Sequence, residues 1–118
     1  MQKENPALNK SFEFAKKIVF LYKDITTNQK EYILSKQLLR SGTSIGANIS
    51  EANGAISTAD FSNKISIAYK ECLETKYWLR LLKETNYISE SISNQLFDKA
   101  DELGKILFSI LKKTRINK

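Results

Sequence analysis

The stretch SGTSIGANISEANGA, residues 41–55, holds three of the four glycines in this chain of 118 residues. It does not fit a phosphate-binding P-loop, because Gly42 and Gly46 are four residues apart instead of five and Ala47, not lysine, follows. The Rossmann spacing G-x-G-x-x-G is absent as well. A seam of small and apolar residues runs through the stretch in steps of four and three, which predicts a helix. The seam consists of Leu34, Leu38, Ser41, Ile45, Asn48 and Ala52.

Four small residues of this predicted helix share one ridge at intervals of four: Gly42, Gly46, Ser50 and Gly54. A glycine inside a helix costs about 0.5–1 kcal/mol relative to alanine. We therefore predict that the ridge lets a partner helix approach the backbone closely, with a hinge or kinked helix as the alternative. Asn48 lies in the seam, where we predict a buried amide bonded to a neighbouring helix, with catalytic use as the alternative.

The same four–three periodicity recurs along the whole chain and predicts an all-α fold. The expected architecture is an antiparallel up-down-up-down four-helix bundle in a single domain, residues 1–118. Its predicted helices cover residues 6–25, 30–57, 58–86 and 90–114. The expected N-caps are Asn5 followed by Pro6, then Ser57 or Thr58, and then Ser89. The cluster from Thr26 to Asn28 is predicted to form a turn.

Two of the predicted helices carry more apolar surface than one neighbouring helix usually covers. The first has two stripes, one containing Phe12 and Val19 and the other Phe14 and Ile18. The third has a second stripe that consists of Ile67, Glu71, Glu74, Trp78 and Leu81. We interpret this stripe as a further interface, inside the bundle or between subunits, with Arg40 as one partner of the two acids. The alternative is a catalytic acid/base pair.

The composition excludes several classes of function. The chain has no histidine, which excludes a Ser/His triad, a His-ligated zinc site and a di-iron site of the Glu-x-x-His kind. No uninterrupted apolar stretch is long enough to span a membrane, and residues 1–10 lack the apolar core of a signal peptide. The single Cys72 fits a reducing cytoplasm, where we expect the protein. We expect no enzyme activity, cofactor or metal.

The formal net charge is +6, from 19 basic and 13 acidic residues, and the excess is spread along the chain. Basic residues at helical spacing form stripes on the first and third predicted helices: Lys10, Lys16, Lys17, Lys23, Lys76, Arg80 and Lys83. These stripes predict contacts with phosphates that do not depend on base sequence, and a solvated face is the alternative. Tyr69 and Tyr77 are near enough to stack on a base, although packing is the commoner role of such aromatic residues.

The chain resembles the bacterial four helix bundle protein family, also called the 23S ribosomal RNA intervening-sequence protein family, most specifically in its middle part. That family has a core S-I-x-x-N-I-x-E-(A/G), which is matched here by Ser44, Ile45, Asn48, Ile49, Glu51 and Ala52. Its later motifs D-F, I-A, E-x-x-E-T and Y-W-L are matched by Asp60-Phe61, Ile67-Ala68, Glu71 to Thr75 and Tyr77 to Leu79. The resemblance covers nearly the whole chain.

Several members of this family are similar to the accessory variability determinant of diversity-generating retroelements. That relative is a basic homopentamer which works with a reverse transcriptase and nucleic acid. The resemblance therefore implies a pentamer, with RNA or DNA and a reverse transcriptase or other nucleoprotein as expected partners. Five chains of +6 would together carry +30. The resulting hypothesis is a non-enzymatic homo-oligomer that binds nucleic acid or a nucleoprotein partner, and the alternative is an adaptor that binds only protein.

Overall fold

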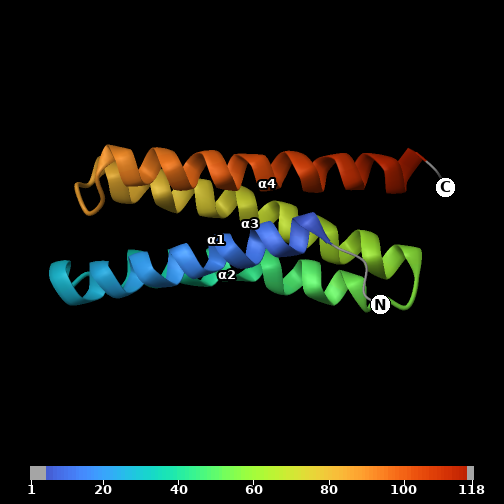
Figure 1. Ribbon diagram of the computed structural model, residues 1–118, viewed down its shortest axis with the longest axis horizontal. Helices are drawn as coiled ribbons and strands as arrows, with labels where there is room; N and C mark the ends of the chain where they lie inside the picture. Colours follow the sequence, from blue (N-terminus) through green and yellow to red (C-terminus); the bar gives the residue numbers. More distant parts are fainter. Residues whose placement is uncertain (1–4, 117–118) are drawn as a thin grey trace.

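The computed structural model describes residues 5–116, which form four α-helices joined by short connections (Figure 1). They are α1 (Pro6–Asp24), α2 (Leu34–Asn53), α3 (Thr58–Glu84) and α4 (Glu90–Ile116). Successive helices pack side by side and run in opposite directions, and a less extensive contact between α1 and α4 closes the bundle. The predicted all-α four-helix bundle is confirmed. Residues 1–4 and 117–118 of the predicted domain lie outside the described residues.

Three of the helices start at the residues that the sequence predicts as N-caps. The Asn5 side chain accepts a hydrogen bond from the Leu8 amide at 3.0 Å, and Pro6 takes the first helical position. The hydroxyl of Ser57 accepts from the Asp60 amide at 3.0 Å, so Ser57 and not Thr58 is the cap of α3. The Ser89 hydroxyl likewise accepts from the Ile92 amide at 3.1 Å, before α4.

The boundaries of α2 differ from the prediction, which placed this helix at residues 30–57. The predicted turn at residues 26–28 is instead a π-helical turn, Ile25–Gln29, which continues α1 and ends where Lys30 takes a left-handed φ of 53°. At the other end, α2 stops at Asn53 because the amides of Gly54 and Ala55 turn back onto the carbonyls of Glu51 and Ala52.

The Glu31 carboxylate caps the N-terminus of α2. It accepts hydrogen bonds from the amides of Ile33, Leu34 and Ser35 at 3.0, 2.8 and 2.8 Å. These amides have no carbonyl partner at a helix start, and a carboxylate there also interacts favourably with the helix dipole. Burial acts to raise the pKa of Glu31, but the three amide hydrogen bonds outweigh it and lower the pKa. The remaining helix ends lie within two residues of the prediction.

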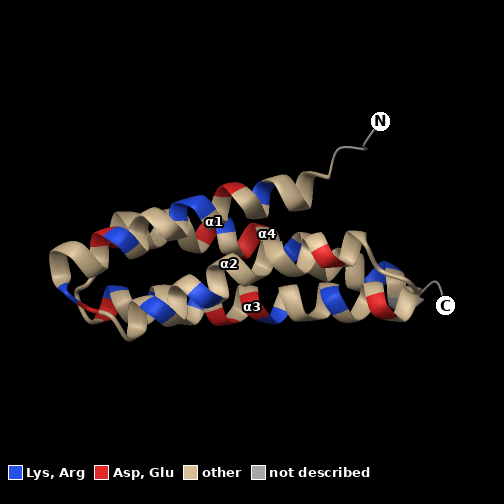
Figure 2. Cartoon of the chain, turned by 90° about the horizontal axis from the view of Figure 1, so that it is seen from below, with Lys and Arg blue, Asp and Glu red and all other residues tan. Residues whose placement is uncertain are grey.

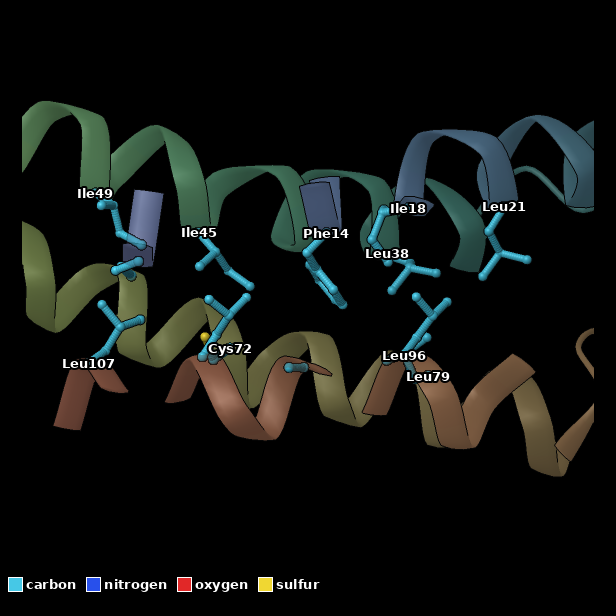
Figure 3. Packing of buried hydrophobic residues seen from close by; sticks show 14 of the residues in the cluster. Phe14, Ile18, Leu21, Leu38, Ile45, Ile49, Cys72, Leu79, Leu96 and Leu107 are labelled. Carbon is cyan, nitrogen blue, oxygen red and sulfur yellow. The ribbon is translucent and has the colours of Figure 1, made fainter. Parts of the chain in front are cut away.

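Charged residues are spread along all the helices (Figure 2), while the apolar seams converge on one core (Figure 3). Of the two stripes on α1, the one with Phe14 and Ile18 is buried, whereas Phe12 is 62% exposed. The predicted seam on α2 placed Asn48 in the core after Ile45. In the structure Ile49 is the buried residue at this point, and Asn48 is only half-buried. None of the helices in the described part of the chain is long and apolar enough to cross a membrane.

Candidate nucleic-acid interface

Two of the four predicted ridge residues face α1 at close range. A Cβ atom added to Gly42 would lie 2.9 Å from carbon atoms of Ile18, and one added to Gly46 would lie 3.0 Å from the hydroxyl of Ser11. Ser50 and Gly54 are exposed, and Gly54 is the residue at which α2 ends. α2 continues as an unbroken helix through Gly42 and Gly46, as the packing-ridge prediction requires.

Within the described part of the chain Asn48 makes no hydrogen bond to a neighbouring helix, so that expectation is wrong. Its amide is half-buried and donates a hydrogen bond to the Ser44 carbonyl, one turn earlier in the same helix, at 2.8 Å. A buried polar link between α2 and α3 is made instead by a hydrogen bond from the hydroxyl of Thr75 to that of Ser41, at 3.0 Å. A seam of four–three steps cannot separate Asn48 from Ile49, and the structure buries the side chain without polar atoms.

Arg40 pairs with both acids of the second α3 stripe, as the sequence suggested. Its guanidinium donates to Glu71 at 3.1 Å and also to Glu74. The indole N–H of Trp78 donates to the same Glu74 carboxylate at 2.9 Å. The Trp78 hydrogen bond lowers the pKa of Glu74, and Arg40 adds to this effect against the opposing influence of burial. These side chains therefore form a clamp between α2 and α3.

The seven candidate basic residues fall into two groups on helices that are diagonally opposed in the bundle. Four lie on α1 and three on α3, and these two helices have no extensive contact. The structure therefore does not gather them on one face, and Figure 2 shows blue basic segments interspersed with red acidic ones.

Three of the seven already have carboxylate partners. Lys10 pairs with Glu102 of α4 at 3.2 Å, and Lys16 pairs with Glu13 of its own helix at 3.0 Å. Lys76 pairs with Asp101 of α4 at 2.8 Å. The remaining four, which make no ion pair with a residue in the range 5–114, are Lys17, Lys23, Arg80 and Lys83.

Exposed phenylalanines with a lysine ammonium over the ring form a recurring feature. Lys16 lies 5.8 Å from the ring centroid of Phe12, and Lys23 lies 6.0 Å from that of Phe20. Lys112 lies 5.9 Å from the ring centroid of Phe108 on α4. Each distance is within the range of a cation–π interaction.

Sequence reasoning missed the pair on α4. A signal for it was present, because Phe12 with Lys16 and Phe108 with Lys112 share the same spacing of four, which places both members on one helix face. Of the two tyrosines considered for stacking, Tyr69 packs against the Phe108 ring, with centroids 5.7 Å apart. Tyr77 is 59% exposed and packs edge-on against Trp78.

The family model described as 23S rRNA-intervening sequence protein matches residues 3–109. The chain belongs to this family. The 23S rRNA-intervening sequence protein family was the one that the motifs on α2 and α3 had indicated, so that resemblance is confirmed. The chain is also similar to a crystal structure of a protein of unknown function from the S23 ribosomal protein family of Bacteroides thetaiotaomicron VPI-5482. The sequences are 53% identical and the TM-score is 0.89, with 90% of this chain and 98% of that chain covered. None of the curated proteins matches this chain.

Proposed function

We propose that this member of the 23S rRNA-intervening sequence protein family is a non-enzymatic homo-oligomer that binds nucleic acid or a nucleoprotein partner. The observation that carries the proposal is the set of basic side chains without an ion-pair partner among residues 5–114, namely Lys17, Lys23, Arg80 and Lys83. A cation that is not neutralised by a carboxylate can contact a phosphate and release its counterion. A reverse transcriptase is the nucleoprotein partner to test first, because the sequence suggests a likeness to the accessory variability determinant of diversity-generating retroelements, which works with such an enzyme.

The outer face of α1 supports self-association. Phe12 and Phe20 are 62% and 66% exposed on this face. Beside them lies an apolar groove of about 720 Å³ between α1 and α2, which exists because Thr43, Gly46, Ala47 and Ser50 are small. Exposed aromatic residues beside an apolar groove are typical of surfaces that bind protein. We propose that copies pack through this face as a pentamer.

If copies pack through the outer face of α1, some basic residues of α1 lie in the contact between copies and others stay available for phosphate contact. Lys16 and Lys23 share the helix face of Phe12 and Phe20, since positions four, eight and eleven residues apart lie close together around a helix. Copies that pack on this face would cover Lys16 and Lys23, so Lys17, Arg80 and Lys83 are the residues without an ion pair in the range 5–114 that stay available for phosphate contact. Lys10 and Lys17 lie together on an adjacent face, next to α4. Lys17 is exposed and is therefore the α1 residue that we assign to phosphate contact.

The clamp residues support a role without catalysis. Glu71 and Glu74 are the acids that an acid/base mechanism would need, and both accept hydrogen bonds from Arg40. Glu74 also accepts one from Trp78, and its lowered pKa makes it a weaker base. Carboxylates held in this way connect two helices, and they are poorly placed to exchange protons with a substrate.

The test is light scattering coupled to size exclusion, with separate pools of RNA and duplex DNA oligonucleotides at low and moderate salt. We expect the mass of five subunits and a shift with nucleic acid that weakens steeply as salt rises. A monomer that ignores both pools would contradict the proposal. An oligomer that ignores both pools at every salt concentration would instead favour the protein-only adaptor.

A pair of matched variants then tests the basic residues. Lys17→Gln removes a lysine with no ion pair among the described residues, and Lys10→Gln removes one that is paired with Glu102. We expect Lys17→Gln to reduce the slope of log affinity against log salt by about one. Lys10→Gln should reduce it less, because part of the charge of Lys10 is already neutralised. Equal slopes for wild type and both variants would contradict the assignment of Lys17.

A further inference from the structure

A hollow of about 300 Å³ lies between α3 and α4. Its inner wall includes Cys72 and Gly104, which are both buried. A Cβ atom added to Gly104 would lie 3.8 Å from that of Cys72, so the two helices meet here through small residues. Because neither residue extends a long side chain, the space between the flanking residues stays open. Its volume is at the lower end for small-molecule sites and suits one flat ring system better than a folded element.

Aromatic rings form one side of the hollow. Phe108 of α4 and Tyr69 of α3 have ring centroids 5.7 Å apart and an interplanar angle of 41°. Tyr69 is half-buried, whereas Phe108 remains 48% exposed although it belongs to a helix with a well-packed inner face. The structure therefore presents an apolar ring at the surface of the hollow, backed by a second ring.

Three lysines also line the hollow, and one aspartate pairs with two of them. Lys76 contacts Asp101 at 2.8 Å, and Lys105 contacts the other carboxylate oxygen of Asp101 at 3.1 Å. The third, Lys112, lies over the Phe108 ring. Three lysines against one aspartate leave the lining with a net charge of +2. Lys112 is exposed and makes no ion pair with a residue in the range 5–114, so it is available to an anion at the mouth. Lys105 is 79% exposed at its side chain and would contact an anion by exchanging its surface ion pair with Asp101.

We propose that this hollow is a subsite for one unpaired base of a single-stranded nucleic acid and the phosphates that flank it. The base takes the place of the Lys112 ammonium over the Phe108 ring, with Tyr69 behind that ring, and the phosphates contact Lys105 and the displaced Lys112. An aromatic platform beside cations is the combination that binds single strands, because every base has a flat face and every linkage carries a negative charge. The inference rests on the proposed function and narrows its ligand to single strands. A duplex keeps its bases stacked and offers this hollow only phosphates.

The test measures binding by fluorescence anisotropy of labelled oligouridylate and oligothymidylate of about 12 nucleotides, a length within the usual site size. A duplex of the same length is the third probe. We expect Phe108→Ala to weaken binding of the single strands by on the order of tenfold. Duplex binding should stay the same, since the duplex cannot insert a base. The two single strands distinguish RNA from DNA as the source of the base.

Three further variants make the result specific. Phe108→Tyr keeps the flat ring and should restore single-strand affinity. Lys105→Gln changes a side chain that is mostly in solvent and should weaken binding without affecting folding. Tyr32→Ala removes another exposed aromatic residue, 57% accessible, which precedes α2 and does not line the hollow. It should bind like the wild type.

The outcomes separate this inference from the proposed function. If the wild type binds none of the probes, both fail. If it binds and Phe108→Ala retains the affinity of the wild type for single strands, the hollow is not a base subsite, although the proposed function stands. If Phe108→Ala changes the oligomeric mass but leaves affinity unchanged, the hollow is a contact between copies, and this too would overturn the inference.

Discussion

A Cβ atom on Gly42 of α2 would lie 2.9 Å from both Cγ1 and Cγ2 of Ile18 on α1. Ile18 is fully buried, and its branched Cβ restricts the side chain to few rotamers. The neighbour therefore cannot swing aside, as a long flexible side chain could. The absence of a side chain at Gly42 is what allows α1 and α2 to approach so closely.

We predict that Gly42→Ala destabilises the protein by about 1–3 kcal/mol, because overpacking a core forces strain or displacement. Helix propensity alone predicts the opposite sign, since alanine stabilises a helix by about 0.5–1 kcal/mol relative to glycine. A loss of stability would therefore come from crowding against the neighbouring helix. Urea denaturation followed by circular dichroism would measure the change. Gly54→Ala is the matched control, because Gly54 is exposed and an added Cβ would meet only a backbone oxygen at 3.7 Å.

A double variant identifies the cause. In an Ile18→Ala background the atoms that crowd the new methyl group are gone, so Gly42→Ala should cost less there than in the wild type. An equal cost in the two backgrounds would show that the Ile18 contact is not the reason that glycine is needed.

We predict that Glu31→Ala destabilises the protein by about 1 kcal/mol, as removal of a helix cap usually does. The pKa of Glu31 is lowered in the folded protein, so its contribution is fully present above the ordinary value of 4.5. It disappears as the pH falls through the lower pKa of the folded state. The difference in unfolding free energy between wild type and variant should therefore be constant near neutral pH and shrink in acid.

Glu84→Ala provides the control for this cap. Glu84 is the last residue of α3 and is exposed, where a negative charge opposes the helix dipole. Its removal should leave stability unchanged or slightly higher. A loss equal to that of Glu31→Ala would mean that net charge, and not the cap, explains the effect.

The bundle could be predicted from the sequence because each seam keeps its four–three steps along a whole helix. Which stripe of α1 faces inward could not, since the stripes of Phe12 and Phe14 have the same spacing and similar apolar character. That choice depends on where α2 and α4 lie. The start of α2 was missed because Glu31 acts as a cap from three residues before Leu34, while the predicted N-cap residues are short polar ones.

The candidate site was less predictable than the fold. The partner of Glu71 and Glu74 could be suggested because antiparallel packing of α2 and α3 brings Arg40 to the same level along the bundle axis as the two acids. The hollow could not, since its rings come from Tyr69 and Phe108, 39 positions apart, and meet only through the relative rotation of α3 and α4.

We predict that Arg40→Met destabilises the protein by about 1 kcal/mol or less, because the pair is partly exposed and solvent screens it. In Arg40→Met the pKa of Glu74 should rise toward its ordinary value, since one of the groups that lower it is gone. A double-mutant cycle with Glu74→Gln would measure the coupling. A coupling of zero would show that Trp78 alone holds Glu74 and that the guanidinium is not needed.

Burial raises the pKa of the Cys72 thiol to about 12, from an ordinary value of 9.0. At pH 8 the folded thiol should therefore carry on the order of a thousandfold less thiolate than an unfolded one. We predict that iodoacetamide modifies the folded protein very slowly and the urea-unfolded protein quickly. The raised pKa also means that ionisation of the unfolded thiol lowers stability as the pH rises above about 9.

Cys72→Ala should lack that alkaline decrease, and comparison of the two proteins between pH 8 and about 10.5 would measure it. The labelling rate also reports on the hollow between α3 and α4, because Cys72 is part of its inner wall. Rapid labelling that does not depend on urea would mean that this wall opens to solvent in the folded state. The thiol would then not have the low reactivity that its burial predicts.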